Sequence, residues 1–164
     1  MKTSQANLIN SLTLILMPLW SYLTYEGTAE KPDQSITALI PLFLGVILLL
    51  CHYGLIKKPK TESELELDAH WFAYNLAKGE NISYEEFLPI HAELMVKKQL
   101  KKRKVISHIA VVITLIAIGG LSKPLMSAIE EGRNLGIFRV SLMVLTSIIA
   151  MISFVKSFIE ARKK

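Results

Sequence analysis

Two histidines lie at matching distances from the ends of apolar segments. His52 is five residues before Lys57, and His108 is four residues after Lys104. If these segments span a membrane, both imidazoles lie about 6 to 8 Å inside the same boundary. Paired histidines on neighbouring spans can hold a haem iron or a metal ion, or relay protons. Histidines near span ends also commonly hydrogen-bond a backbone carbonyl, and this structural role is the interpretation that we favour.

The densest charge cluster of the chain directly precedes its third apolar block. Its members are Lys97, Lys98, Lys101, Lys102, Arg103 and Lys104. Basic residues beside a span fix its orientation, and we favour this topological role. Each base near an anionic leaflet also contributes about 1 kcal/mol, so contact with lipid or with an acidic partner is compatible with it.

The middle of the chain has the outline of a degenerate EF-hand. Ile82 and Glu86 take the places of the central hydrophobe and the final acidic ligand, but Ala77 and Gly79 replace two oxygen ligands. We therefore expect no calcium site. The sequence contains no specific catalytic, metal or nucleotide motif, and we expect neither an enzyme nor a bound cofactor.

The elements that carry these residues are long apolar blocks. Residues 36–56 contain no Asp, Glu, Lys or Arg, and 21 residues of helix cover about 30 Å, the thickness of the bilayer core. Residues 8–25, 105–121 and 137–159 are similar, and Arg139 and Lys156 can snorkel to opposite head-group layers. Gly119, Gly120 and Pro124 should weaken the end of the third block, leaving a polar connection at 122–134 with a short interfacial helix at 125–129. The sequence predicts an all-α membrane protein with four transmembrane helices, the first of them uncleaved.

The basic residues predict the orientation of these spans. Fifteen of the 19 Lys and Arg residues fall at the two termini and in the middle segment, against four in the two short connections. The positive-inside rule then places both termini and the middle segment in the cytoplasm. The expected organisation is a first transmembrane hairpin at 1–60, a cytoplasmic helical insert at 61–99 and a second transmembrane hairpin at 100–164.

The middle segment has the signals of two helices. Thr61 with Glu64, and Ser83 with Glu86, have capping-box spacing, and Gly79 should end the first helix. That helix carries an apolar stripe of Leu65, Phe72 and Leu76, and we expect a helical hairpin that packs Trp71, Phe72 and Phe87 together. Pro89 suggests that the second helix has an irregular first turn or begins near Leu88. No breaker follows before residue 118, so this helix should continue into the third span as one rod of about 45 Å.

Three apolar blocks also carry a family resemblance. The segments ITALIPLFLGVILLL, HIAVVITLI and RVSLMVLTSIIAMISFVKSFIEARKK resemble those of small uncharacterised bacterial integral membrane proteins with four predicted spans. The resemblance covers the second to fourth spans and implies the bacterial inner membrane. It transfers no activity and no functional residues.

The leading functional hypothesis is an accessory or assembly subunit that binds a protein partner through its cytoplasmic insert. The alternatives are a small oligomeric transporter or ion-conducting protein, and a haem protein that uses His52 and His108. The expected partners are the lipid bilayer and either a membrane protein or further copies of the chain. Nucleic acid is not expected, because the net charge of +5 comes from basic residues beside apolar blocks.

Overall fold

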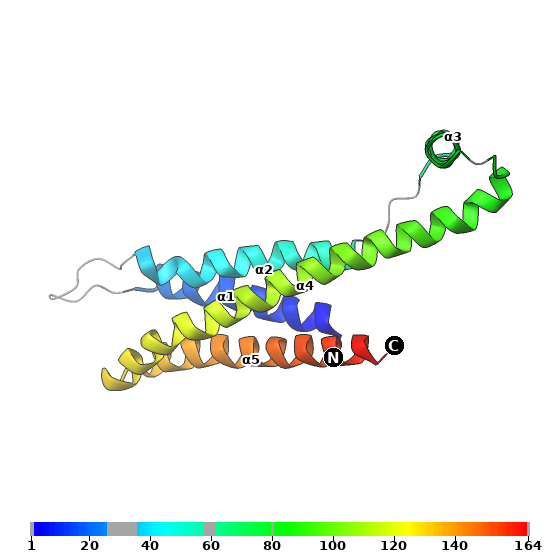
Figure 1. Ribbon diagram of the computed structural model, residues 1–164. Coiled ribbons are helices and arrows are strands. Elements are labelled where there is room, and N and C mark those ends of the chain that lie inside the picture. Colours follow the sequence, from blue (N-terminus) through cyan, green and yellow to red (C-terminus); the bar gives the residue numbers. More distant parts are fainter. Residues whose placement is uncertain (1, 26–35, 58–61, 80, 164) are drawn as a thin grey trace. The chain divides into compact units, whose positions relative to one another are not determined.

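A computed structural model describes residues 2–25, 36–57, 62–79 and 81–163, and every regular element in these ranges is helical (Figure 1). The elements are α1 (Thr3–Leu23), the short 3₁₀ helix η1 (Ile36–Leu39), α2 (Ile40–Ile56), α3 (Glu64–Lys78), α4 (Tyr84–Glu130) and α5 (Asn134–Arg162). Four helical stretches are long and apolar enough to cross a membrane: Thr3–Leu23, Ile36–Ile56, Tyr84–Glu130 and Asn134–Arg162. An all-helical protein with four such helices is therefore confirmed. The short connection between the first two apolar blocks, at 26–35, and the predicted cap at Thr61 lie outside the described residues.

The chain forms two compact units. We call Met1–Ile56 together with Ile106–Lys164 the bundle, and Lys57–Val105 the insert. Helix α4 is continuous over both, as the absence of breakers predicted. It begins at Tyr84, so of the two alternatives given for Pro89 the start near Leu88 does not occur. Pro89 is tolerated in its second turn because only one backbone bond, to the carbonyl of Glu85, is lost there.

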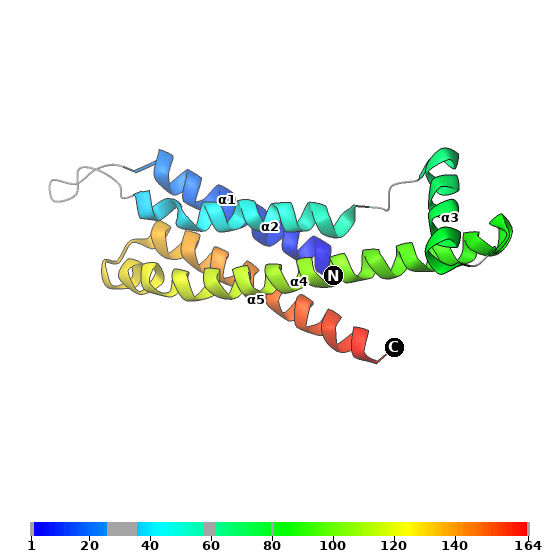
Figure 2. The ribbon, with the colours of Figure 1, turned by 45° about the horizontal axis from the view of Figure 1, so that its top comes forward.

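Within the bundle, α1 packs against both α2 and α5 (Figures 1 and 2). The buried residues of α1 share one helix face because they are spaced by three or four residues, and they are Ala6, Asn7, Asn10, Ser11, Leu14 and Pro18. Three of these six side chains are polar. The interior of α1 therefore depends on hydrogen bonds as well as on apolar contact.

The contact between α1 and α2 is close. Asn7 Nδ2 donates a 2.8 Å hydrogen bond to the Leu48 carbonyl, and the ring of His52 lies 2.8 Å from the Ser4 carbonyl. Residue numbers rise along α1 as they fall along α2, so the two helices are antiparallel. At Gly45, a Cβ would lie 2.9 Å from the Ser11 carbonyl oxygen. Only glycine permits this separation, as at other tight helix contacts in membranes.

Helix α5 contacts α1 through a second set of polar groups. Asn10 Oδ1 accepts hydrogen bonds from Ser147 at 2.9 Å and from Thr146 at 3.2 Å. Towards the other end of α1, Arg139 donates to Thr24 at 3.0 Å, and its guanidinium lies 4.3 Å from the Trp20 ring centre. These pairs also run in opposite directions along the two helices, so α1 and α5 are antiparallel.

The expected break after the third apolar block does not occur. Helix α4 passes through Gly119, Gly120 and Pro124 and ends at Glu130, so the separate interfacial helix predicted at 125–129 is wrong. Pro124 removes only the backbone bond to the Gly120 carbonyl, and the helix continues through it as it does through Pro89. The Ser122 hydroxyl donates to the Gly119 carbonyl at 2.6 Å. Gly132, with φ of 62°, then reverses the chain before α5.

Candidate functional site

The insert contains two capped helices. Ser63 and Glu66 form the capping box of α3, two residues after the box predicted at Thr61 and Glu64. The box at Ser83 and Glu86 is confirmed, with hydrogen bonds of 3.1 and 3.3 Å. Gly79, with φ of 68°, ends α3 as predicted. These signals fix where each helix begins and therefore which side chains can meet.

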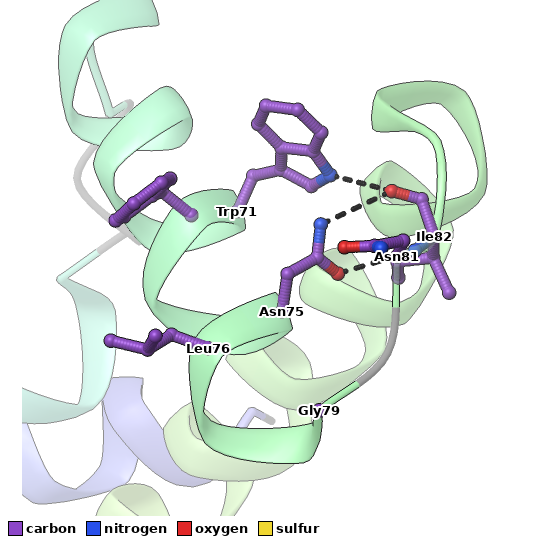
Figure 3. A pocket seen from close by; sticks show the side chains of 7 residues that line it. Trp71, Asn75, Leu76, Gly79, Asn81 and Ile82 are labelled. Atoms are coloured by element: carbon purple, nitrogen blue, oxygen red, sulfur yellow. Dashed lines mark hydrogen bonds between the residues drawn. The ribbon is translucent and has the colours of Figure 1, made fainter.

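The turn between α3 and α4 is held by two side chains of α3 (Figure 3). The Trp71 indole N–H donates to the Ile82 carbonyl at 2.9 Å. The Asn75 amide donates to the same carbonyl at 3.2 Å and accepts from the Ile82 N–H at 3.3 Å. Asn75, which would be the first ligand of an EF-hand loop, is thus engaged in fixing the turn.

Behind the turn, α3 and α4 share a small aromatic core. Phe87 is 1% exposed, and its ring centre lies 5.7 Å from that of Tyr74 and 5.1 Å from that of His91. Phe72 is not part of this core, so its predicted packing with Phe87 is wrong. The reason is helical geometry, since Phe72 is two residues from Tyr74 and points about 200° away from it.

The apolar stripe of α3 is therefore exposed. Leu65, Phe72 and Leu76 are 82%, 68% and 77% exposed. Phe72 and Leu76 also border an open pocket of about 570 Å³, whose other lining residues are Trp71, Asn75, Gly79, Asn81 and Ile82 (Figure 3). We call Leu65, Phe72 and Leu76 the α3 stripe. The α3 stripe forms an apolar ridge next to this pocket.

Acidic residues surround the α3 stripe. Glu64 and Glu66 lie in the first turn of α3, and Asp68 follows in the next. Desolvation, and then the negative charges of Asp68 and Glu64, raise the pKa of the Tyr84 phenol. These three carboxylates make the start of α3 acidic.

A group of metal-ligating side chains also lies in the insert. Ligand atoms of Glu62, His70 and His91 all lie within 4.8 Å of one another. His91 Nε2 is 3.4 Å from Glu62 Oε2, and His70 Nε2 is 3.9 Å from Glu62 Oε1. The two imidazole rings lie 5.3 Å apart between centres. Two imidazole nitrogens and one carboxylate are a ligand set suited to a transition metal ion.

The group of Glu62, His70 and His91 was not predicted from the sequence, although the positions of its two histidines contain a signal for it. The turn between the two helices is centred near residue 81. His70 and His91 lie at nearly equal distances on either side of it, each four residues from a core aromatic, Tyr74 or Phe87. Residues four apart share a helix face, so packing Tyr74 on Phe87 brings the histidines together. Glu62 precedes α3, and no helical spacing predicts its position.

The two histidines singled out from the sequence have different neighbours. His52 Nδ1 lies 2.8 Å from the Ser4 carbonyl, so this nitrogen carries the proton and donates to α1. The ring of His108 lies against Phe158 of α5, with ring centres 4.9 Å apart. This hydrogen bond to a backbone carbonyl is the structural role that we favoured for His52 from the sequence. Each histidine joins its own helix to a different neighbour.

The basic cluster occupies α4 between residues 97 and 104. Lys97 pairs with Glu93 at 2.8 Å, and the hydrogen bond and charge of Lys97 lower the pKa of the Glu93 carboxyl. Lys98, Lys101, Lys102 and Lys104 are exposed, whereas Arg103 is half-buried. Apart from the Glu93 pair, this surface is strongly basic and differs sharply from the acidic start of α3.

The chain was also compared with known proteins. No family model, no curated protein and no solved structure matches it.

Proposed function

We propose that this protein is a non-catalytic accessory or assembly subunit of the inner membrane, which binds a protein partner through the α3 stripe. In this proposal the spans form two hairpins, and both termini and the insert are cytoplasmic, as the distribution of Lys and Arg favours. The single observation that carries the proposal is the exposure of Leu65, Phe72 and Leu76 on one face of α3. Such apolar patches mark interaction surfaces when lipid does not cover them.

The composition of α3 argues against lipid as the occupant of this face. Its 15 residues span about 22 Å, too short for the bilayer core, and Glu64, Glu66 and Asp68 lie beside the stripe. An anionic cytoplasmic leaflet would repel this charge. A protein groove with an apolar floor and a basic rim would complement this helix. The floor would contact the α3 stripe, and the rim would pair with the carboxylates beside it. Anchors spaced like those of the α3 stripe are typical of a helix that binds in a groove.

A second candidate, transport by a small oligomer, is favoured by a pocket of the bundle. This pocket has a volume of about 620 Å³, and Lys123, Arg133 and Arg139 lie among its lining residues. Transport is the second candidate because the buried polar groups do not line this pocket. Asn7, Asn10 and Ser147 instead form hydrogen bonds between helices. A transport path requires such groups to face the pocket.

The test is site-specific photo-crosslinking of the full-length protein in its native membrane, with the photoreactive residue at position 72. We expect one protein adduct, the same protein in every preparation and stoichiometric after mild-detergent purification. The disruptive variant replaces Leu65, Phe72 and Leu76 by serine and should reduce co-purification at least tenfold. The matched control replaces Val96 and Leu100, which are also exposed but lie on α4, and should leave it unchanged. Crosslinking only to lipid, or only to a second copy of the chain, would refute the proposal.

A further inference from the structure

The insert has too small an apolar core to hold its two helices together easily. Phe87 is its one buried hydrophobic residue among those that the structure describes. Units of fewer than about 50 residues usually need a disulfide, a metal ion or association to be stable. The one cysteine of the chain, Cys51, lies in the bundle, so a disulfide within the insert is impossible.

The geometry points to a metal ion as the missing constraint, and we infer that Glu62, His70 and His91 form a binding site for a divalent transition metal ion of the zinc class. The three ligands come from the segment before α3, from α3 and from α4. A bound ion would therefore connect the two helices across their small aromatic core. This site does not depend on the proposed partner binding.

The distances within the group favour coordination over hydrogen bonding. An imidazole–carboxylate hydrogen bond is about 2.7–3.2 Å long, and both contacts of Glu62 exceed this range, at 3.4 and 3.9 Å. Two ligand atoms at about 2.0–2.1 Å from a tetrahedral zinc ion are about 3.4 Å from each other. The separation of His91 Nε2 from Glu62 Oε2 equals this value. His70 Nε2 lies 3.9 Å from the other oxygen, Oε1, and the ligand atoms of the group lie within 4.8 Å of one another. Binding one ion through all three side chains would therefore draw their ligand atoms together by up to about 1.4 Å.

Burial provides an independent argument. The side chains of Glu62 and His91 are only 14% and 15% exposed, and Glu62 Oε2 has no hydrogen-bond partner among the residues that the structure describes. A mostly buried carboxylate oxygen without a partner is costly, and a cation is one of the groups that offsets this cost. The ring of His91 is also held in position by Phe87, so little rotamer freedom is lost on binding.

The ligand set indicates the kind of ion and the openness of the site. Imidazole and carboxylate together suit Zn²⁺ and its neighbours, whereas Mg²⁺ and Ca²⁺ prefer oxygen ligands alone. Three protein ligands leave the fourth tetrahedral position to water. His70 is 55% exposed and provides an access route to this position.

The test is a Zn²⁺ titration of the full-length protein in detergent, purified without a polyhistidine tag and stripped with a chelator. We expect one ion per chain and a higher thermal midpoint of the insert with Zn²⁺ bound. The variants His70→Ala, His91→Ala and Glu62→Gln should each weaken binding at least about 100-fold, more than the loss of a supporting residue would cause. Glu62→Gln is the decisive variant because residue 62 lies outside both helices and its loss leaves their packing intact.

The matched control is the double variant His52→Ala and His108→Ala, which removes from the bundle two imidazoles, as many as the proposed site contains. It should bind Zn²⁺ with unchanged affinity. Two outcomes would overturn the inference. One is a folded wild-type protein that retains no ion after desalting, and the other is Zn²⁺ binding that Glu62→Gln and His91→Ala leave intact.

Discussion

The bundle and the insert use apolar side chains in opposite ways. In the bundle, the interior between α1, α2 and α5 contains small and polar groups such as Asn10, Gly45 and Ser147, while Leu16, Leu50 and Ile152 are exposed. These exposed residues belong to helices that can cross a membrane, where lipid covers them. The α3 stripe is equally exposed but lies on a short acidic helix. In the function proposed above, the exposure of a leucine therefore means contact with lipid in the bundle and a partner-binding face in the insert.

The largest expected effect tests the interior of the insert. Phe87→Ala removes the buried aromatic between Tyr74 and His91 and should cost about 3–5 kcal/mol, enough to unfold a unit with so small a core. Hydrogen exchange of the full chain in detergent would show this as lost amide protection over α3. The matched control is Phe72→Ala, the same chemical change at an exposed position, which should leave protection unchanged. Equal loss of protection in both variants would show that the α3 stripe is part of the core.

The second effect tests how tightly the bundle is packed. Gly45→Ala places a Cβ 2.8 Å from Ile15 and 2.9 Å from the Ser11 carbonyl, so α1 and α2 must separate. We expect a loss of about 1–3 kcal/mol, the usual range for overpacking. The control is Gly119→Ala, where a Cβ meets no atom within 4 Å and helix propensity should keep or raise stability. Unfolding in a denaturing detergent measures the stability of both variants. Equal unfolding midpoints for Gly45→Ala and Gly119→Ala would contradict the close contact at Gly45.

The third effect tests the polar contacts between bundle helices. Asn10→Ala removes the acceptor shared by Thr146 and Ser147 and should cost about 1 kcal/mol, in line with interhelical hydrogen bonds in membranes. Thr13→Ala is the control, because the Thr13 hydroxyl donates only to the Ile9 carbonyl of its own helix at 2.9 Å. If Thr13→Ala destabilises as much as Asn10→Ala, the interhelical bonds contribute nothing beyond local effects.

Much of the fold could be predicted from the sequence because membrane spans depend on length and composition. The four apolar helices, the uninterrupted passage of α4 beyond Pro89 and the helix end at Gly79 follow from local patterns. The expected break at Pro124 did not occur, because a proline inside a long helix removes one backbone hydrogen bond, which α4 tolerates here as it does at Pro89. The role of Asn10 could not be predicted either. Its partners lie on α5, more than 130 positions away in the chain, and no periodicity identifies them.

The candidate sites show the same limit. The sequence identified the α3 stripe from its spacing but predicted that Phe72 would be buried. Which face of a helix is covered depends on the other helix and not on hydrophobicity alone. The group of Glu62, His70 and His91 required the packing of Tyr74 on Phe87 before its members could be connected. His52 and His108 were prominent in the sequence because they lie at matching distances from the ends of their apolar segments. Such distances do not show which side chains they contact.

The smallest expected effect tests the basic region of α4. Lys97 lowers the pKa of Glu93 through a hydrogen bond and its charge, so the folded carboxyl binds its proton less tightly than an unfolded one. The pair therefore stabilises α4 above the ordinary glutamate pKa of about 4.3, and this contribution is lost as the pH falls through the lowered value. Because both side chains are exposed, the effect on stability should be small and reduced by salt. A direct NMR titration of Glu93 measures it best. Lys97→Met should return the pKa towards its ordinary value, whereas Lys98→Met, the removal of an adjacent lysine, should change it less. An equal response to both would mean that Glu93 responds to the general charge of the basic cluster and not to one partner.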